Sequence, residues 1–460
     1  MKNVSLGGLT LAIACSPLAA QWNQASPATS PSARSGHALC YDSTGNRALL
    51  FGGSAGFSTS NETWSFDGSN WTQLSPIASP TGKTGMELVH DPIRGVTVMY
   101  GSMSTSFFGG PSVDETWEFD GTTWTQVFPV TTPGGLGNYG ACYDLLRQRV
   151  VIYGGSADSF FPIAESGTWE FDGTNWTQMQ VPATPGPLER PSMCFSINLG
   201  KTVMFGGIDP QIGGNDTTWL YDGTSWTAAN VVGVKPSPRT GAEMVYDSNR
   251  GVCVLSGGVD PMTGQAIVET WEFDGTSWAQ MPSVNTGRYG HSMAYLPAQK
   301  QVLQFGGIDP STFSDLADTW EYGAKSRTFG TGCAGSNGVP ALAAVDAPRL
   351  GATYTLNVTN LVPSSAFAFM ATGLSDQTGP FGALPFSLAG FGMPGCSALV
   401  SGEALVLIPA TAGTATWNAT MPNAAAFMGL TLFQQAISFD AAANAAGLTV
   451  SNAHAGVVGR

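Results

Sequence analysis

Five basic residues recur ahead of a repeated strand and are the clearest candidates for ligand chemistry. They are Arg34, Lys83, Arg190, Arg239 and Arg288. The chain holds 18 Lys and Arg residues against 32 Asp and Glu residues, for a net charge of −14. Guanidinium groups offer paired donors to a carboxylate or sulfate, and a narrow opening focuses their charge. The pattern predicts an anionic-ligand site. A second interpretation stays open, in which these side chains belong to the scaffold and pair with nearby acids.

Catalytic and metal-binding patterns are missing from the sequence. It has no phosphate loop, Cys-x-x-Cys or His-Glu-x-x-His motif. His37 and His291 share one repeat position, which favours a packing role over a two-histidine metal site. An acid precedes most copies of a Thr-Trp pair, and a residue that recurs in this way indicates scaffold: Glu62, Glu115, Asp216, Glu269 and Asp318. We therefore predict no catalytic residue, no metal and no cofactor.

The cysteines separate into two groups. Cys333 and Cys396 are the only pair in the C-terminal part, and an exported compartment favours a disulfide between them. One repeat position that holds Val or Ala in other units holds a cysteine in three of them: Cys40, Cys142 and Cys194. Cys253 lies in a predicted strand. We expect all four to be buried free thiols that act as small apolar groups.

The elements that position these residues come from a repeat of about fifty residues. A Thr-Trp pair ends at Trp64, Trp117, Trp169, Trp219, Trp271 and Trp320. Except after the last pair, a second Trp follows Phe/Tyr-Asp-Gly, and paired glycines precede most copies. Asp-Gly is a strong hairpin signal because glycine accepts a positive φ without steric cost. Each unit therefore reads as four strands.

This pattern resembles the kelch repeat over roughly residues 22–322. The resemblance implies a six-bladed β-propeller across residues 21–322. Some kelch propellers are copper-radical oxidases, but the cluster of His, Tyr and Cys that this chemistry needs is not visible here. The sixth repeat lacks its second Trp, whereas Trp22-Asn23-Gln24 matches Trp71-Thr72-Gln73. We predict that the N-terminal strand completes the last blade, because an open ring leaves strand edges unpaired.

The composition changes on either side of the repeats. Residues 1–20 have the layout of a secretory signal peptide, with lipoprotein anchoring through Cys15 as a minor alternative. After a linker at 323–330, short apolar stretches in residues 331–460 suggest a β-sandwich. The segment Gly330-Thr331-Gly332-Cys333-Ala334-Gly335, together with Ser451-Asn452 near the end, resembles a domain appended to exported bacterial repeat proteins. The expected location is secreted, periplasmic or on the cell surface, with no transmembrane segment.

Two function classes remain open. The acidic net charge disfavours nucleic acid and anionic membranes as partners. The favoured class is a non-catalytic binding protein that presents propeller loops to a glycan or protein partner, possibly anionic. The alternative is an enzyme on acidic sugars, because some exported bacterial kelch propellers are sialic-acid mutarotases. A single cluster of unequal residues at one end of the ring would favour the second class.

Overall fold

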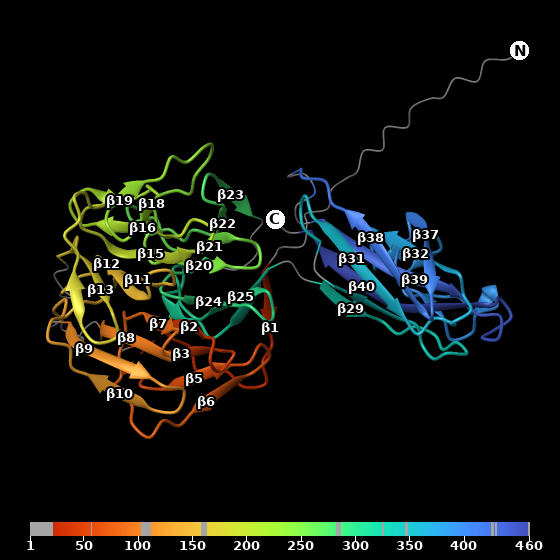
Figure 1. Ribbon diagram of the computed structural model, residues 1–460, viewed down its shortest axis with the longest axis horizontal. Coiled ribbons are helices and arrows are strands. Elements are labelled where there is room, and N and C mark those ends of the chain that lie inside the picture. The colour runs from red at the N-terminus through yellow and green to blue at the C-terminus, as the bar shows by residue number, and fades with distance from the viewer. Residues whose placement is uncertain are drawn as a thin grey trace, which may run out of the picture. The chain divides into compact units, whose positions relative to one another are not determined.

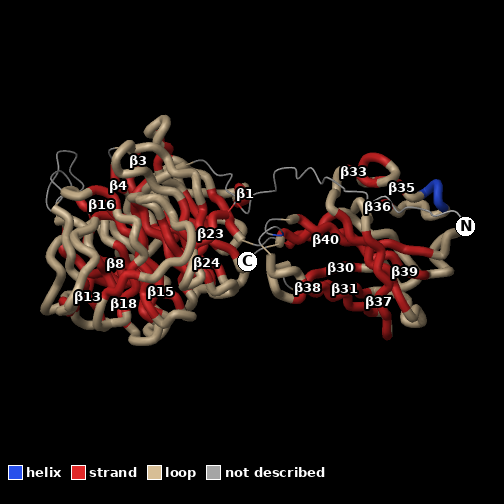
Figure 2. Tube along the Cα trace, turned by 90° about the horizontal axis from the view of Figure 1, so that it is seen from above, coloured by secondary structure: helices blue, strands red, loops and turns tan. Residues whose placement is uncertain are grey.

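The described part of the chain forms two compact units, within Gln21–Gly323 and Ala324–Arg460. The computed structural model describes residues 22–56, 58–102, 112–157, 163–281, 287–323, 326–345, 348–424, 427 and 430–458. The predicted signal peptide lies outside them. Strands and loops build both units (Figure 2). A short 3-10 helix, η1 (Ala389–Phe391), lies in the second unit. No helix among these residues has the length and apolar character to cross a membrane.

The first unit is a six-bladed β-propeller with four antiparallel strands in each blade. Its inner strands surround the centre in Figure 1, and the outer strands lie at the periphery. From inner to outer, the first three blades are β2 (Ser35–Asp42), β3 (Arg47–Ala55), β5 (Thr63–Phe66), β6 (Trp71–Leu74); β7 (Leu88–Asp91), β8 (Val96–Ser102), β9 (Val113–Phe119), β10 (Trp124–Val127); and β11 (Gly140–Asp144), β12 (Arg149–Tyr153), β13 (Thr168–Phe171), β14 (Trp176–Gln178).

The other three blades follow the same order. They are β15 (Glu189–Ser196), β16 (Lys201–Asp209), β18 (Trp219–Tyr221), β19 (Trp226–Ala228); β20 (Glu243–Asp247), β21 (Val252–Ser256), β22 (Thr270–Phe273), β23 (Trp278–Met281); and β24 (Ser292–Leu296), β25 (Gln301–Phe305), β28 (Thr319–Tyr322), β1 (Trp22–Ala25). Two-residue strands decorate the loops between second and third strands: β4 (Ser58–Thr59), β17 (Gly213–Gly214), β26 (Ile308–Asp309) and β27 (Ser314–Asp315).

The repeated Thr and Trp residues join each blade to the one before it. In all six blades the indole N–H of the outer-strand Trp donates to the threonine hydroxyl of the preceding blade's Thr-Trp pair. The donor, acceptor and distance are Trp22 to Thr270, 2.7 Å; Trp71 to Thr319, 3.0 Å; Trp124 to Thr63, 3.0 Å; Trp176 to Thr116, 3.0 Å; Trp226 to Thr168, 2.9 Å; and Trp278 to Thr218, 2.9 Å. Each indole is at most 3% exposed, so the ring buries a large apolar body and satisfies its polar atom.

The N-terminal strand closes this ring. β1 pairs antiparallel with β28, from Trp22 opposite Tyr322 to Ala25 opposite Thr319. Strand β28 therefore has partners on both sides, and the last blade exposes no unpaired third-strand edge. The match between the segments at Trp22 and Trp71 corresponds to this arrangement, since both begin outer strands.

The C-terminal unit is all-β, and its described long strands form one hydrogen-bonded sequence of eight. Their order is β29 (Ser326–Phe329), β40 (Leu448–Val457), β39 (Thr431–Phe439), β32 (Phe367–Gly373), β37 (Ala404–Thr411), β38 (Thr414–Thr420), β31 (Thr353–Thr359), β30 (Ala341–Ala344). Strand β37 connects two halves, because Ala404–Pro409 pair with β32 whereas Ala410 and Thr411 pair with β38. A core that includes Tyr354, Leu356 and Met370 lies inside.

Asn452 of β40 joins the far end of this sheet to its beginning. Its side-chain oxygen accepts from the backbone N–H of Leu342 in β30 at 2.8 Å, and its amide nitrogen donates to the Leu342 carbonyl at 3.0 Å. An asparagine amide thus takes the place of a neighbouring strand's backbone. The sheet therefore curls until its edge strand β30 is covered by β40. Because the long elements described in this unit are all strands, the prediction of an all-β unit is confirmed.

A long loop with short elements covers part of the outer face of this unit. It contains β33 (Thr378–Gly379), β34 (Gly382–Ala383), β35 (Phe386–Ser387), η1 and β36 (Ser397–Ala398). The predicted Cys333–Cys396 disulfide is present and ties the loop to the start of the unit across a separation of 63 residues. Both sulfurs lie in a small core with Met393 and Val450.

Removal of this disulfide should destabilise the C-terminal unit. Closing 63 residues in the unfolded chain corresponds to about 4 kcal/mol on the chain-entropy account. We expect the Cys333→Ser/Cys396→Ser variant to lose about that much unfolding free energy in urea. The same shift should appear when the wild type is reduced, and reduction should leave the double variant unchanged. An equal midpoint for oxidised and reduced wild type would contradict this prediction.

Candidate functional site

Four of the five basic residues singled out in the sequence are buried in ion pairs. Arg34, Lys83, Arg239 and Arg288 are at most 1% exposed. Each pairs with the acid ahead of the Thr-Trp pair of its own blade. The pairs are Arg34–Glu62, 2.5 Å; Lys83–Glu115, 2.8 Å; Arg239–Glu269, 2.7 Å; and Arg288–Asp318, 2.7 Å. This geometry is that of the scaffold interpretation, in which the basic residues hold the blade together.

The first blade shows how such a pair is built. Arg34 donates to Glu62 and to the carbonyl of Gly52, the first glycine of the pair within β3. The Trp64 indole donates to the same carboxylate at 3.0 Å. Burial alone would raise the pKa of Glu62, but the hydrogen bonds from Arg34 and Trp64 hold that pKa below its ordinary value. The repeated acid, the repeated Arg and the glycine pair therefore form one structural unit.

Arg190 differs from the other four. It lies in a ring of six equivalent residues, one per blade, whose φ angles all fall between +53° and +67°: Gly36, Gly85, Asn138, Arg190, Gly241 and Gly290. Backbone hydrogen bonds join neighbours around this ring, including Gly36 N–H to Gly290 O at 2.8 Å and Arg190 N–H to Asn138 O at 2.7 Å. The side chain of Arg190 is exposed. The ring narrows the centre of the propeller at the end where the inner strands begin.

A cavity of about 350 Å³ occupies the centre toward the other end of these strands. All six inner strands line it, together with the first residue of each turn from inner to second strand: Ser43, Pro92, Leu145, Ile197, Ser248 and Pro297. The anionic-ligand site predicted from the five basic residues was expected at the opposite end, beside the loops that enter the inner strands. The size is in the range of small-molecule sites, and the cavity is therefore the candidate functional site.

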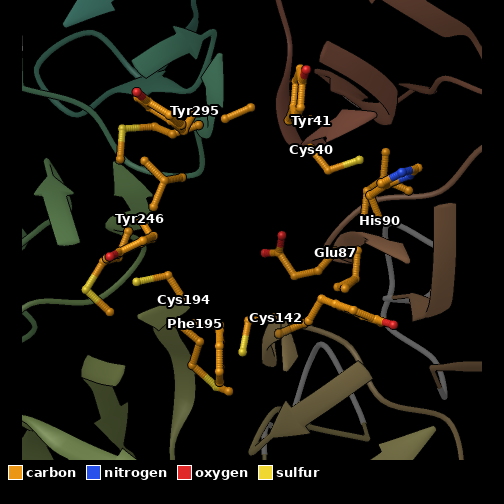
Figure 3. A pocket seen from close by; sticks show the side chains of 18 of the residues that line it. Cys40, Tyr41, Glu87, His90, Cys142, Cys194, Phe195, Tyr246 and Tyr295 are labelled. Carbon is orange, nitrogen blue, oxygen red and sulfur yellow. The ribbon is translucent and has the colours of Figure 1, made fainter. Parts of the chain in front are cut away.

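An aromatic or imidazole ring stands at one equivalent position in every inner strand. The six lining residues are Tyr41, His90, Tyr143, Phe195, Tyr246 and Tyr295. Those that Figure 3 labels surround an open space. The Tyr41 and Tyr143 hydroxyls donate to Asn46 and Asp91 at 2.8 and 2.7 Å. These polar tips are thus engaged by protein groups, and the rings supply mainly apolar wall.

Two carboxyl groups break the six-fold similarity of the lining. Glu87 directly precedes β7 in the second blade, and Glu243 begins β20 in the fifth, so they come from opposite blades of the ring. Figure 3 shows Glu87 pointing into the open space. Among the described residues, no hydrogen bond or ion pair joins either carboxyl to a protein group. No lysine or arginine occurs among the lining residues.

The surroundings make both carboxyl groups weak acids. Burial raises the pKa of Glu87 to about 8. Burial and then the negative charge of Glu87 raise the pKa of Glu243 well above its ordinary value. With no ligand bound, Glu87 is therefore largely protonated at neutral pH, and the pKa of Glu243 is shifted in the same direction. Perturbed carboxyl groups of this kind, in a cavity, are a mark of functional sites.

These glutamates were missed in the sequence, although a signal for them exists. The same repeat position holds small side chains in the other blades: Ala38, Gly140, Ser192 and Ser292. An acid in two of six repeats is a departure from the scaffold pattern, whereas the predicted site rested on residues that the repeats share. The ring position next to the shared cysteine site recurs in every blade, so it could have been found from the repeat itself.

The free cysteines agree with their predicted role. All four are buried, and Cys40, Cys142 and Cys194 line the cavity. Burial raises the pKa values of the Cys40 and Cys142 thiols to about 12. They are protonated at neutral pH and behave as small apolar groups, since the thiolate is the reactive form.

His37 and His291 are buried in neighbouring blades outside the cavity lining. Burial and the nearby charge of Arg34 lower the pKa of His37 to about 3. The His37 and His291 rings lie against Gly306 and Gly257, one glycine of the pair in the preceding blade. Within the described ranges, no three His, Cys, Asp or Glu side chains are grouped so as to hold a metal ion.

The carboxyl pair is thus the feature that distinguishes this cavity from the repeated scaffold around it. It combines two weak acids with aromatic and aliphatic wall, and one end is narrowed by backbone. No protein-family model and no curated protein sequence matches this chain.

Proposed function

We propose that this protein is an exported, non-catalytic binding protein that takes a small ligand into the central cavity of its propeller. The observation that supports this most is the pair of carboxyl groups, Glu87 and Glu243, which reach a cavity of about 350 Å³ without protein partners. Both residues are half-buried, and polar groups that face a concave site without protein partners are available to bind a ligand.

A small glycan unit or other compact polar molecule fits this site better than an anionic ligand. The buried basic residues that suggested an anionic ligand are paired with carboxylates. The cavity itself has two acids and no basic residue in its lining, so a carboxylate or sulfate would find no cationic partner there. The same argument weakens the alternative of an enzyme acting on acidic sugars.

The finer assignments rest on the sequence and are part of this proposal. The glycine pairs and spaced tryptophans of each blade support a kelch-type propeller. The layout of residues 1–20 supports export, and the Cys333–Cys396 disulfide is compatible with it. The two halves bridged by β37 support a sandwich-like C-terminal unit, to which we give a stabilising role.

The test is to fill the cavity and measure binding. Glycan arrays and a small-molecule library identify a ligand for the mature wild type, and its affinity is measured by calorimetry. Val245 lines the cavity, so Val245→Trp should occupy ligand space and weaken binding about tenfold or more, equivalent to about 1.4 kcal/mol.

A matched variant controls for the added indole. Val232 lies in the same unit and is 67% exposed, so Val232→Trp should bind as the wild type does. Circular dichroism and melting curves establish that both variants fold. If the folded Val245→Trp variant binds with wild-type affinity, the ligand lies on the outer loops. If only a protein partner is captured, or nothing is, the small-ligand proposal fails.

A further inference from the structure

We propose that the ligand carries a positively charged nitrogen, an organic ammonium group, which lies between the side chains of Glu87 and Glu243. This inference rests on the proposed function, because it names the chemistry of the ligand that the cavity takes. It comes from the lining residues and their arrangement around the ring.

The lining of the cavity contains acidic side chains but no lysine or arginine. The two carboxyl groups come from opposite blades, and small residues at the same level, Gly140 and Ser192, leave room between them. The basic residues Arg34 and Arg288 belong to the first and sixth blades, but they are bound to Glu62 and Asp318. A half-buried carboxyl group is favoured in its ionised form by a nearby cation, and the lining provides no cationic side chain.

The rest of the wall favours an ammonium ion with an apolar body over a metal ion. Calcium takes six to eight oxygen ligands. The lining residues that follow the glutamate position along the inner strands instead present sulfur, alkyl and aromatic groups, among them Cys194, Met244 and Phe195. The aromatic level lies three residues nearer the turns, about 10 Å along the strand. It therefore suits the apolar body attached to the ammonium group, and the charged nitrogen itself lies at the level of the carboxyl groups.

Binding of such a cation should replace a proton of the carboxyl pair by the positive charge of the ligand. The carboxyl groups hold protons in the empty cavity, and a cation placed between them favours the ionised form, so the ligand enters with its charge and a proton leaves. The other titratable groups that line the cavity are Cys40, Tyr41, His90, Cys142, Tyr143, Cys194, Tyr246 and Tyr295. Among them only His90 has an ordinary pKa near 7, and burial lowers that pKa. Burial raises the pKa values of the thiols and tyrosines, so the proton released near pH 7 comes from the glutamates.

The experiment compares two probes of nearly the same shape, 2-phenylethylammonium and neutral 2-phenylethanol. Calorimetry of the wild type at pH 7, in buffers with different ionisation enthalpies, measures affinity and proton release together. We expect the ammonium probe to bind about 10- to 100-fold more tightly, which is the range for hydrogen bonds to charged groups. Its binding should release about one proton, and that of the alcohol none.

Glutamine variants locate the effect. Glu87→Gln and Glu243→Gln should each reduce the preference for ammonium, and the double variant should abolish it together with the proton release. Glu165→Gln, at an exposed position in the same unit, is the matched control and should change neither. The Glu87→Gln variant is expected to fold, because the raised pKa of Glu87 means that its ionisation costs stability as the pH rises toward about 8.

The outcomes separate this inference from the proposed function. If both probes, or an array ligand that is neutral, bind equally to the wild type and the glutamine variants, the ammonium assignment is overturned and the cavity remains a ligand site. If Ca²⁺ alone binds and the double variant loses it, the site is a metal site instead. If the ammonium probe binds without proton release, the carboxyl pair is not its partner. If neither probe nor any array ligand binds, the proposed function itself fails.

Discussion

Deleting residues 21–26 is expected to lower the melting temperature of the propeller unit markedly. The deletion removes β1, exposes one edge of β28, and breaks the hydrogen bond from Trp22 to Thr270. The single variant Trp22→Ala should cost about 3–5 kcal/mol of unfolding free energy, the usual range for truncating a buried Trp. Urea unfolding followed by tryptophan fluorescence measures both effects.

Asn23→Ala is the matched control for this strand. Asn23 lies next to Trp22 and its side chain is exposed, so its truncation should change stability by no more than about 0.5 kcal/mol. Unchanged melting of the deletion variant would mean that the ring is stable without its last outer strand. In that case the pairing of β1 with β28 would not be what closes the propeller.

Arg250→Met is the second substitution with a large expected effect. The Arg250 side chain is 1% exposed and bridges Asp247 and Glu272, both of which are 0% exposed. It also lies over the ring of Tyr322, 5.3 Å from the centroid, and the Tyr322 hydroxyl donates to Glu272 at 2.6 Å. Removal of the cation leaves two buried carboxylates uncompensated, so we expect a loss of about 3–5 kcal/mol.

The second blade provides the matched comparison, since Arg94 makes the same bridge in a more exposed setting. Its side chain is 29% exposed, and those of its partners Asp91 and Glu118 are 7% and 17% exposed. Solvent screens this network, so Arg94→Met should cost about 1 kcal/mol or less in the same urea experiment. Equal losses for the two variants would show that burial does not decide the strength of these bridges.

The propeller could be predicted because each blade repeats the residues that join it to its neighbour. The outer-strand Trp and the Thr of the Thr-Trp pair have contacts with each other in every blade, so selection for one interface leaves six copies of one pattern. Ring closure followed from the same pattern, since only the segment at Trp22 could supply the missing sixth outer strand.

The candidate site could not be read in the same way, because it depends on where the repeats differ. The repeat position of Glu87 and Glu243 holds an acid in only two of the six blades. Only the circular arrangement places the second blade opposite the fifth. The prediction from Arg34 and Arg239 weighed ligand binding against pairing with nearby acids, and only the packed structure shows how deeply each cation lies beside its carboxylate. Strand order in the C-terminal unit was also out of reach, because β37 divides its pairing between two neighbours.

The closure of the ring by β1 has a consequence for the biosynthesis of the chain. Trp22 is made some 250 residues before Thr270, its hydrogen-bond acceptor, since their separation is 248. Contacts of such long range close late, because their loop entropy must be overcome first. During synthesis β1 therefore waits, unpaired, until β28 emerges, and a chain stalled before residue 319 cannot complete the circle. Such a truncated product would present the edges that the finished ring conceals, which makes it a substrate for proteases and chaperones.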